Sequence, residues 1–150
     1  MSEKNPIFGD RETKFLHSNG LKMAYEDFGQ PGDPAILLVA GLYNQLVRWP
    51  VEFCQMLADS GFYVIRFDNR DIGLTDKMDG VSAPGLLRLF LKSYLGVPVS
   101  APYSLNDMAA DTVGVLDALN IAQAHIVGMS MGGMISQVLV SQHPERVKSF

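Results

Sequence analysis

A serine flanked by glycines is the residue of this chain with the clearest potential for chemistry. The run Gly128-Met129-Ser130-Met131-Gly132 follows Ala124 to Val127, a short apolar stretch that predicts a strand. The residues after it, Met134 to Val140, predict a helix. This strand–turn–helix context favours a nucleophile elbow, with Ser130 at the tip of a strained turn, over a tight turn that carries an idle serine.

The predicted turn would also place polar backbone groups beside Ser130. A helix that begins directly after the serine leaves the N–H of Met131 free and points its positive dipole end at any oxyanion formed on a substrate carbonyl. Glycines at 128 and 132 suit the turn because residues without Cβ leave room where the chain comes close to itself. The chemistry predicted here is nucleophilic attack by a serine hydroxyl.

Serine needs a base, and none of the histidines is expected to supply one. His125 lies five residues upstream on an extended strand, roughly 15 Å away at about 3.3 Å per residue. His143 lies thirteen residues along a helix, about 20 Å away at 1.5 Å per residue. His17 falls in an N-terminal hairpin expected at the sheet edge. We expect structural roles for all three, since proton transfer needs an approach of roughly 3 Å.

Composition narrows the class of protein. The chain has 150 residues, is 47% hydrophobic and carries a net charge of −4, which suits one domain over residues 1–150 and offers no basic patch for nucleic acid. No apolar stretch is long enough to span a membrane, and residues 1–10 lack the apolar region of a signal peptide. Cys54 is the single cysteine and is expected to be buried. We expect a cytoplasmic protein without metal or cofactor.

The remaining pattern predicts the elements that must position Ser130. Asn19-Gly20 between two strand-like runs predicts a hairpin. The other expected elements are strands at 35–40, 62–67 and 146–150, and helices at 48–60, 84–95 and from Ser104 onward. A hairpin followed by β-α units predicts an α/β fold with a mostly parallel sheet flanked by helices. Ligands then bind where the loops 41–47, 68–76 and the elbow converge.

Three motifs, taken in chain order, make the sequence resemble an α/β-hydrolase. Val39-Ala40-Gly41-Leu42 stands where the family usually has His-Gly, and Asp68 to Thr75 is similar to its Asp-x-Arg-Gly-x-Gly-x-Ser. The elbow is the third motif, and His143 to Val147 matches the usual sequence after the elbow helix. Ala-Gly for His-Gly, and Arg-Asp for Arg-Gly at positions 70–71, resemble the aclacinomycin methylesterase-like branch.

The resemblance implies roles for particular residues. Ser130 would be the nucleophile, and the backbone N–H groups of Leu42 and Met131 would form the oxyanion hole. Gly41, Tyr43 and Met129 would contact substrate. An apolar mouth is expected from Leu42, Tyr43, Leu46, Trp49, Met129 and Met131. Ala40 cannot brace this loop as a family histidine does, whereas Asp68 and Arg70 are interpreted as loop braces rather than chemical groups.

The family order of a triad is Ser, then Asp or Glu, then His, but only twenty residues follow Ser130. We therefore expect the chain to be the N-terminal part of an α/β-hydrolase fold, with the C-terminal strands, the acid and the histidine beyond Phe150. Residues 80–100 would be either a lid over an apolar substrate group or an ordinary packed helix.

The resemblance implies a hydrolase that acts on a small, mainly apolar carboxylic ester through an acyl-enzyme on Ser130. Other chemistry on the same fold stays open: cofactor-free haloperoxidase, C–C bond hydrolysis or acyl transfer. A non-catalytic ligand-binding remnant is a further alternative. The expected partner is the small-molecule ester, with no nucleic acid or membrane, and the oligomeric state is left open.

Overall fold

The computed structural model describes residues 12–78, 94–96 and 102–150. Within them, six strands form one sheet in the order β1-β2-β4-β3-β5-β6. β1 pairs antiparallel with β2 and β2 with β4, whereas the pairs β4–β3, β3–β5 and β5–β6 are parallel. The strand bounds are β1 Lys14–Ser18, β2 Leu21–Phe28, β3 Ala35–Val39, β4 Tyr63–Phe67, β5 Ala124–Gly128 and β6 Val147–Ser149. The predicted mixed sheet with an antiparallel N-terminal hairpin is confirmed.

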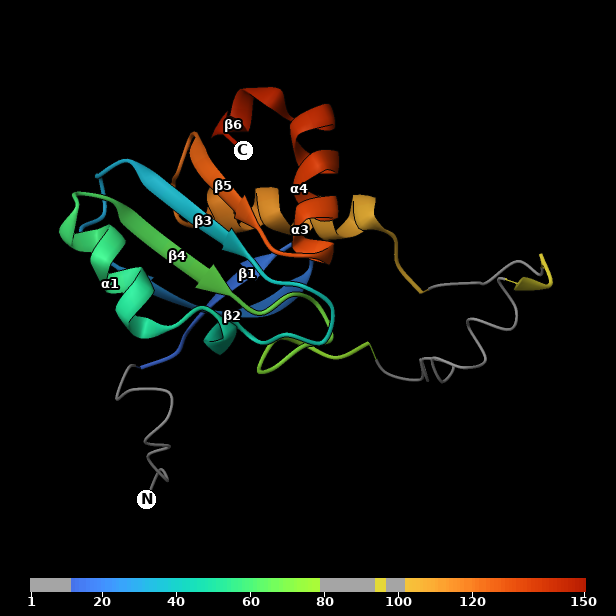
Figure 1. The fold of residues 1–150 in the computed structure, drawn as a ribbon. Coiled ribbons are helices and arrows are strands. Elements are labelled where there is room, and N and C mark those ends of the chain that lie inside the picture. The colour runs from blue at the N-terminus through green and yellow to red at the C-terminus, as the bar shows by residue number, and fades with distance from the viewer. Residues whose placement is uncertain (1–11, 79–93, 97–101) are drawn as a thin grey trace, which may run out of the picture.

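Helices cover both faces of this sheet (Figure 1). Helix α1 (Val51–Asp59) packs on one face over a small apolar cluster that includes Phe28, Leu38 and Cys54. Helices α3 (Leu105–Ala118) and α4 (Met131–Gln142) pack on the other face over the larger cluster. Because successive strand residues point to opposite faces, the all-apolar run of β3 supplies both clusters, with every residue buried.

Local signals explain where several elements begin. The two-residue hairpin turn has positive φ at Asn19 (48°) and Gly20 (80°), as a type I′ turn requires. Ser104 caps α3, since its hydroxyl accepts the N–H of Asp107 while the Asp107 carboxylate accepts the N–H of Ser104. This predicted capping box, with aspartate in the usual Glu/Gln place, is confirmed.

Two predicted boundaries are wrong. The helix expected from Arg48 begins at Val51, because Trp49 is extended ahead of Pro50, and the residues before it form a separate 3₁₀ turn, η1 (Leu46–Arg48). The strand expected from Arg146 is shorter, since Pro144–Arg146 form the 3₁₀ turn η2 and β6 comprises only Val147–Ser149.

Arg146 lies outside β6. Its guanidinium donates to the carbonyls of Ile121 and Ala122 and forms an ion pair with Asp117. The helix predicted at 84–95, and with it nearly all of the possible lid at 80–100, lies outside the described residues apart from 94–96. Among the described helices, none combines the length and apolarity needed to cross a bilayer.

Candidate active site

Ser130 sits at the junction between β5 and α4 in a backbone conformation that side chains rarely adopt. Its φ is 55° and its ψ is −121°, and it is the N-cap residue of α4. Strain of this kind costs on the order of 1–3 kcal/mol and persists only where the surroundings enforce it. The Ser130 side chain is exposed and makes no capping bond to the helix. Strain together with an exposed hydroxyl is what a nucleophile elbow requires.

Close packing of the backbone enforces this conformation. A Cβ on Gly128 would lie 2.6 Å from the carbonyl oxygen of Gly132, and a Cβ on Gly132 would overlap the carbonyl oxygen of Val39. The turn is held further by the N–H of Met129, which donates to Val39 at 3.1 Å. The two elbow glycines are therefore needed for space, which confirms the steric reason expected from the sequence.

The loop after β3 lies directly against the elbow. A Cβ on Gly41 would lie 3.1 Å from both the Cβ of Ser130 and the carbonyl oxygen of Met129, a tight contact that a glycine avoids. Leu42, the next residue, is 52% exposed. Within the described part of the chain, the backbone N–H groups of Leu42 and Met131 have no acceptor. Both N–H groups are therefore unengaged among the described residues.

Two successive residues after β4 hold the ends of this loop. Asn69 is buried, and its Nδ2 donates to the carbonyl of Ala40 at 3.0 Å. The buried Asp68 carboxylate accepts the N–H of Leu46 at 2.6 Å and that of Leu74 at 2.9 Å. Burial raises the pKa of Asp68, and these backbone donors oppose the rise because they favour the charged form. Asp68 thus braces loops, as interpreted from the sequence, whereas Asn69 was missed.

A second brace ties the loop after β4 to α3. The Arg70 guanidinium binds the Asp111 carboxylate through two hydrogen bonds of 2.6 and 2.7 Å, and both side chains are buried. It also lies 5.1 Å from the ring centroid of Tyr103, a cation–π arrangement. Arg70 is therefore a structural anchor, in agreement with the sequence-based interpretation.

Asp71 and Tyr103 add a polar pair that the sequence analysis missed. Asp71 has φ +66° where the family pattern has glycine, and its carboxylate accepts the N–H of Met78 at 2.5 Å. The Tyr103 hydroxyl donates to the same carboxylate, and burial together with this bond raises the pKa of Tyr103 to about 12. A signal was present in the sequence, since an aspartate in place of a turn glycine must be held by contacts of its own.

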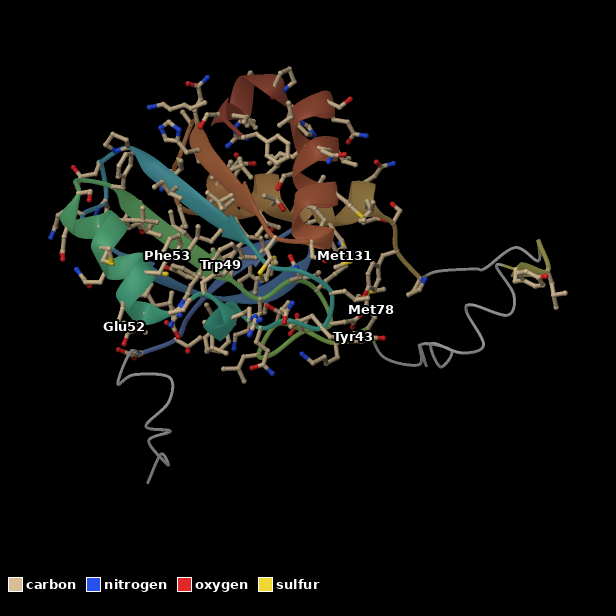
Figure 2. All side chains as sticks on the ribbon, in the orientation of Figure 1. Tyr43, Trp49, Glu52, Phe53, Met78 and Met131 are labelled. Carbon is tan, nitrogen blue, oxygen red and sulfur yellow. The ribbon has the colours of Figure 1, made fainter. Side chains whose placement is uncertain are left out.

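The apolar lining expected around Ser130 is borne out only in part. Figure 2 shows Tyr43, Met78 and Met131, which come from three segments, on the side of the molecule where α4 begins. Two expected members lie elsewhere. Leu46 is only 3% exposed, and Trp49 packs against the α1 cluster and stacks on Phe53 at 6.0 Å between centroids. Neither side chain is therefore available to line the site as expected.

The other predicted contact residues are distributed around Ser130. Gly41 is buried beside it, Met129 is half-buried in the turn, and Tyr43 is 63% exposed with φ +58° at the loop tip. The structure thus brings together Gly41, Leu42, Met129, Ser130 and Met131. Chemically, this part of the chain offers an exposed hydroxyl at Ser130 and two backbone N–H groups, of Leu42 and Met131, without an acceptor among the described residues.

No base reaches Ser130 among the described residues. His125 Nδ1 lies 2.7 Å from the hydroxyl of Ser149, and its ring packs edge-on against Phe62. His143 lies 3.6 Å from a carboxylate oxygen of Glu145. His17 stands opposite Lys22 in the antiparallel register of β1 and β2. Nor do three His, Cys, Asp or Glu side chains gather as a metal ion would need, within the same described ranges.

Comparison with known proteins gives the same assignment as the fold. Residues 34–150 match the family described as alpha/beta hydrolase fold. Rhodomycin D methylesterase DauP from Streptomyces sp. (strain C5) is 33% identical over 135 residues, which are 90% of this chain and 39% of that protein. The putative non-heme bromoperoxidase BpoC of Mycobacterium tuberculosis is 31% identical over 86% of this chain and 40% of its own length. The similarity to a methylesterase branch, predicted at positions 40–41 and 70–71, is confirmed.

Solved structures share the fold. Epoxide hydrolase VrEH1 from Vigna radiata superposes with a TM-score of 0.71 at 20% identity, covering 91% of this chain and 37% of that one. The chain spans about two fifths of the length of the curated relatives it matches.

Proposed function

Because the chain belongs to the α/β-hydrolase family, we propose that it carries the nucleophile and oxyanion hole of an enzyme that hydrolyses a small, mainly apolar carboxylic ester. The Ser130 hydroxyl attacks the ester carbonyl carbon, and the resulting oxyanion accepts hydrogen bonds from the N–H groups of Leu42 and Met131. Collapse releases the alcohol and leaves an acyl group on Ser130, which water then removes.

One observation carries this proposal: the strained backbone of Ser130, with φ 55° and ψ −121°, held against Gly41. The base is a separate part of the proposal. His125 and His143 are engaged elsewhere and His17 lies in the N-terminal hairpin, so the triad acid and histidine are proposed to lie beyond Phe150, in the family order. Substrate class follows from the mouth, where exposed Leu42 and Tyr43 reward burial of apolar area at about 25 cal/mol per Å².

The relatives support the same reaction class. DauP is named a methylesterase, and another relative, at 28% identity, is the 3-oxoadipate enol-lactonase 2 of Acinetobacter baylyi. Both names describe cleavage of an ester bond. A serine at the elbow argues against the chemistry of the epoxide hydrolases that share the fold, since that branch of the family has aspartate there.

The test is Ser130→Ala in the complete protein. Loss of a triad nucleophile lowers turnover on the order of 10⁶-fold, so hydrolysis of short chromogenic esters should vanish while the circular dichroism spectrum is unchanged. Labelling of Ser130 by a fluorophosphonate probe should disappear with it. A folded Ser130→Ala variant with near-wild-type turnover would contradict the assignment. A wild-type protein that never labels would favour a ligand-binding remnant.

A cofactor-free haloperoxidase is the second candidate, supported by the similarity to BpoC. It uses the same serine and fold, so the elbow does not separate the two. An ester panel measured beside a halide-oxidation assay does, because an esterase traps an acyl-enzyme with short esters and gains nothing from bromide and peroxide. A preference for strongly anionic or peptide substrates would contradict the apolar-ester proposal.

A further inference from the structure

We propose that Asn69 is a positioning residue for the oxyanion hole, which holds the carbonyl of Ala40 so that the N–H of Leu42 stays directed at the space beside Ser130. This inference rests on the proposed function. Its basis is the Asn69 side chain, which is 3% exposed and donates from Nδ2 to the Ala40 oxygen at 3.0 Å in a buried contact.

The sheet places Asn69 where it can do this. β3 and β4 are parallel neighbours with Leu38 opposite Arg66, so the residues that follow each strand leave the sheet side by side. Asn69 therefore comes from a different segment than the loop it holds. Ala40 itself has only a methyl group and cannot brace the loop through its own side chain.

Other segments hold the two ends of the loop. Asn69 holds the carbonyl at the start, and the neighbouring Asp68 accepts the N–H of Leu46 at the end. Between them, Leu42 and Tyr43 are 52% and 63% exposed, and the N–H of Asn44 donates to the carbonyl of Gly41 within the loop. Because this bond moves with the loop, the anchors at the ends decide where the Leu42 N–H lies.

On the opposite side, the elbow holds the same strand end. The N–H of Met129 donates to Val39, and Gly41 packs within van der Waals distance of Ser130. Asn69 thus completes a clamp in which Val39 is held from the elbow and Ala40 from β4. A shift of about 1 Å in such a donor costs up to roughly 10²-fold in rate, since the oxyanion needs it at hydrogen-bond distance.

The test compares Asn69→Ala with Ser18→Ala in the complete protein. Ser18 is a matched control because it is also 3% exposed and donates from its side chain to a backbone carbonyl of another element, that of Asp111 at 2.8 Å, outside the loop after β3. Both variants should lower the melting temperature. Only Asn69→Ala should lower kcat by roughly 10- to 100-fold, with KM changed by no more than about threefold, because the loss belongs to the transition state.

The affinity for a transition-state analogue gives a readout that a change in stability alone does not alter. A trifluoromethyl ketone, whose adduct with serine carries an oxyanion, should bind Asn69→Ala more weakly by about the factor lost in kcat. Asn69→Asp adds a pH profile. The introduced carboxylate repels the Ala40 oxygen when charged and donates to it when protonated, so the ratio of its kcat to that of wild type should rise as pH falls.

Three results would overturn the proposal: unchanged kcat in a folded Asn69→Ala, an equal kcat loss in Ser18→Ala, or a flat Asn69→Asp ratio. Ser130→Ala in the same assay separates this failure from failure of the proposed function. If Ser130→Ala is inactive while Asn69→Ala is fully active, only the positioning role is wrong. If Ser130→Ala keeps its activity, the nucleophile assignment is wrong as well.

Discussion

At the scale of single residues, neighbouring glycines of the elbow differ sharply in the room around them. A Cβ on Gly132 would overlap the carbonyl of Val39, whereas a Cβ on Gly133 would meet only the Gly128 oxygen at 3.7 Å, an ordinary contact. Both residues lie in the first turn of α4. The pair therefore separates the need for space from the general effect of replacing a helical glycine.

We predict that Gly132→Ala lowers the free energy of unfolding by about 1–3 kcal/mol or more, because β3 and the elbow must move apart. Gly133→Ala should be neutral or slightly stabilising, since alanine is favoured over glycine in a helix by roughly 1 kcal/mol. Urea denaturation of both variants measures the difference. Equal stabilities would show that the contact between Gly132 and Val39 does not hold the turn.

At the scale of elements, the loop after β4 is docked on the segment that leads into α3. Arg70 binds Asp111 and lies over the ring of Tyr103, whose hydroxyl donates to Asp71. This docking joins two chain segments, the loop after β4 and the stretch from Tyr103 into α3. Because Tyr103 keeps its proton there to a pKa of about 12, the docking should depend on pH at the alkaline end.

The sign follows from linkage. An unfolded chain loses the Tyr103 proton near pH 10, whereas the folded protein retains it to about pH 12. The contribution of Tyr103 to stability is therefore intact below pH 10 and lost as pH rises from 10 toward 12. We predict that Tyr103→Phe flattens the fall of the urea midpoint over this range. Tyr94→Phe is the control, since Tyr94 is 89% exposed. If the urea midpoint of Tyr103→Phe falls as steeply with pH as that of the wild type, Tyr103 is not the group responsible.

At the scale of the whole molecule, one edge of the described sheet is left open. β6 pairs only with β5 among the described strands, and Val127 of β5 and Phe150, which follows β6, are 39% and 59% exposed. An uncovered edge with exposed apolar groups is a template for association. Ser130, the proposed nucleophile, has no base within the described residues.

We therefore predict that residues 1–150 produced alone associate in solution and do not turn over esters. Light scattering and a chromogenic ester assay check the two halves of this prediction. Adding a C-terminal half from the complete protein should restore a defined size together with activity, because it would cover the edge and supply the base. A monomer that turns over ester by itself would show that a base lies within these 150 residues.

Local patterns alone determined much of this protein. Asn19-Gly20 predicts its turn because positive φ at both positions suits these residues. The capping box at Ser104 is equally local, since its partners are three residues apart. Gly128-x-Ser130-x-Gly132 predicts the elbow because the residues on either side of it show, over short stretches, the patterns of a strand and of a helix. Local patterns predicted element boundaries less well: the helix expected from Arg48 begins only at Val51, after η1 and Pro50.

Only the tertiary structure decided which distant residues meet. Arg66 lies in an apolar strand, and its burial depends on Glu26, forty residues away, at 2.5 Å. Asn69 holds Ala40 because two parallel strands end side by side, a register that no local period encodes. Leu46 was expected at the mouth and is buried, since the direction of a loop side chain depends on what packs around it. Periodicity and turn chemistry act over a few residues, whereas the clamp around Ser130 forms only when the sheet is assembled.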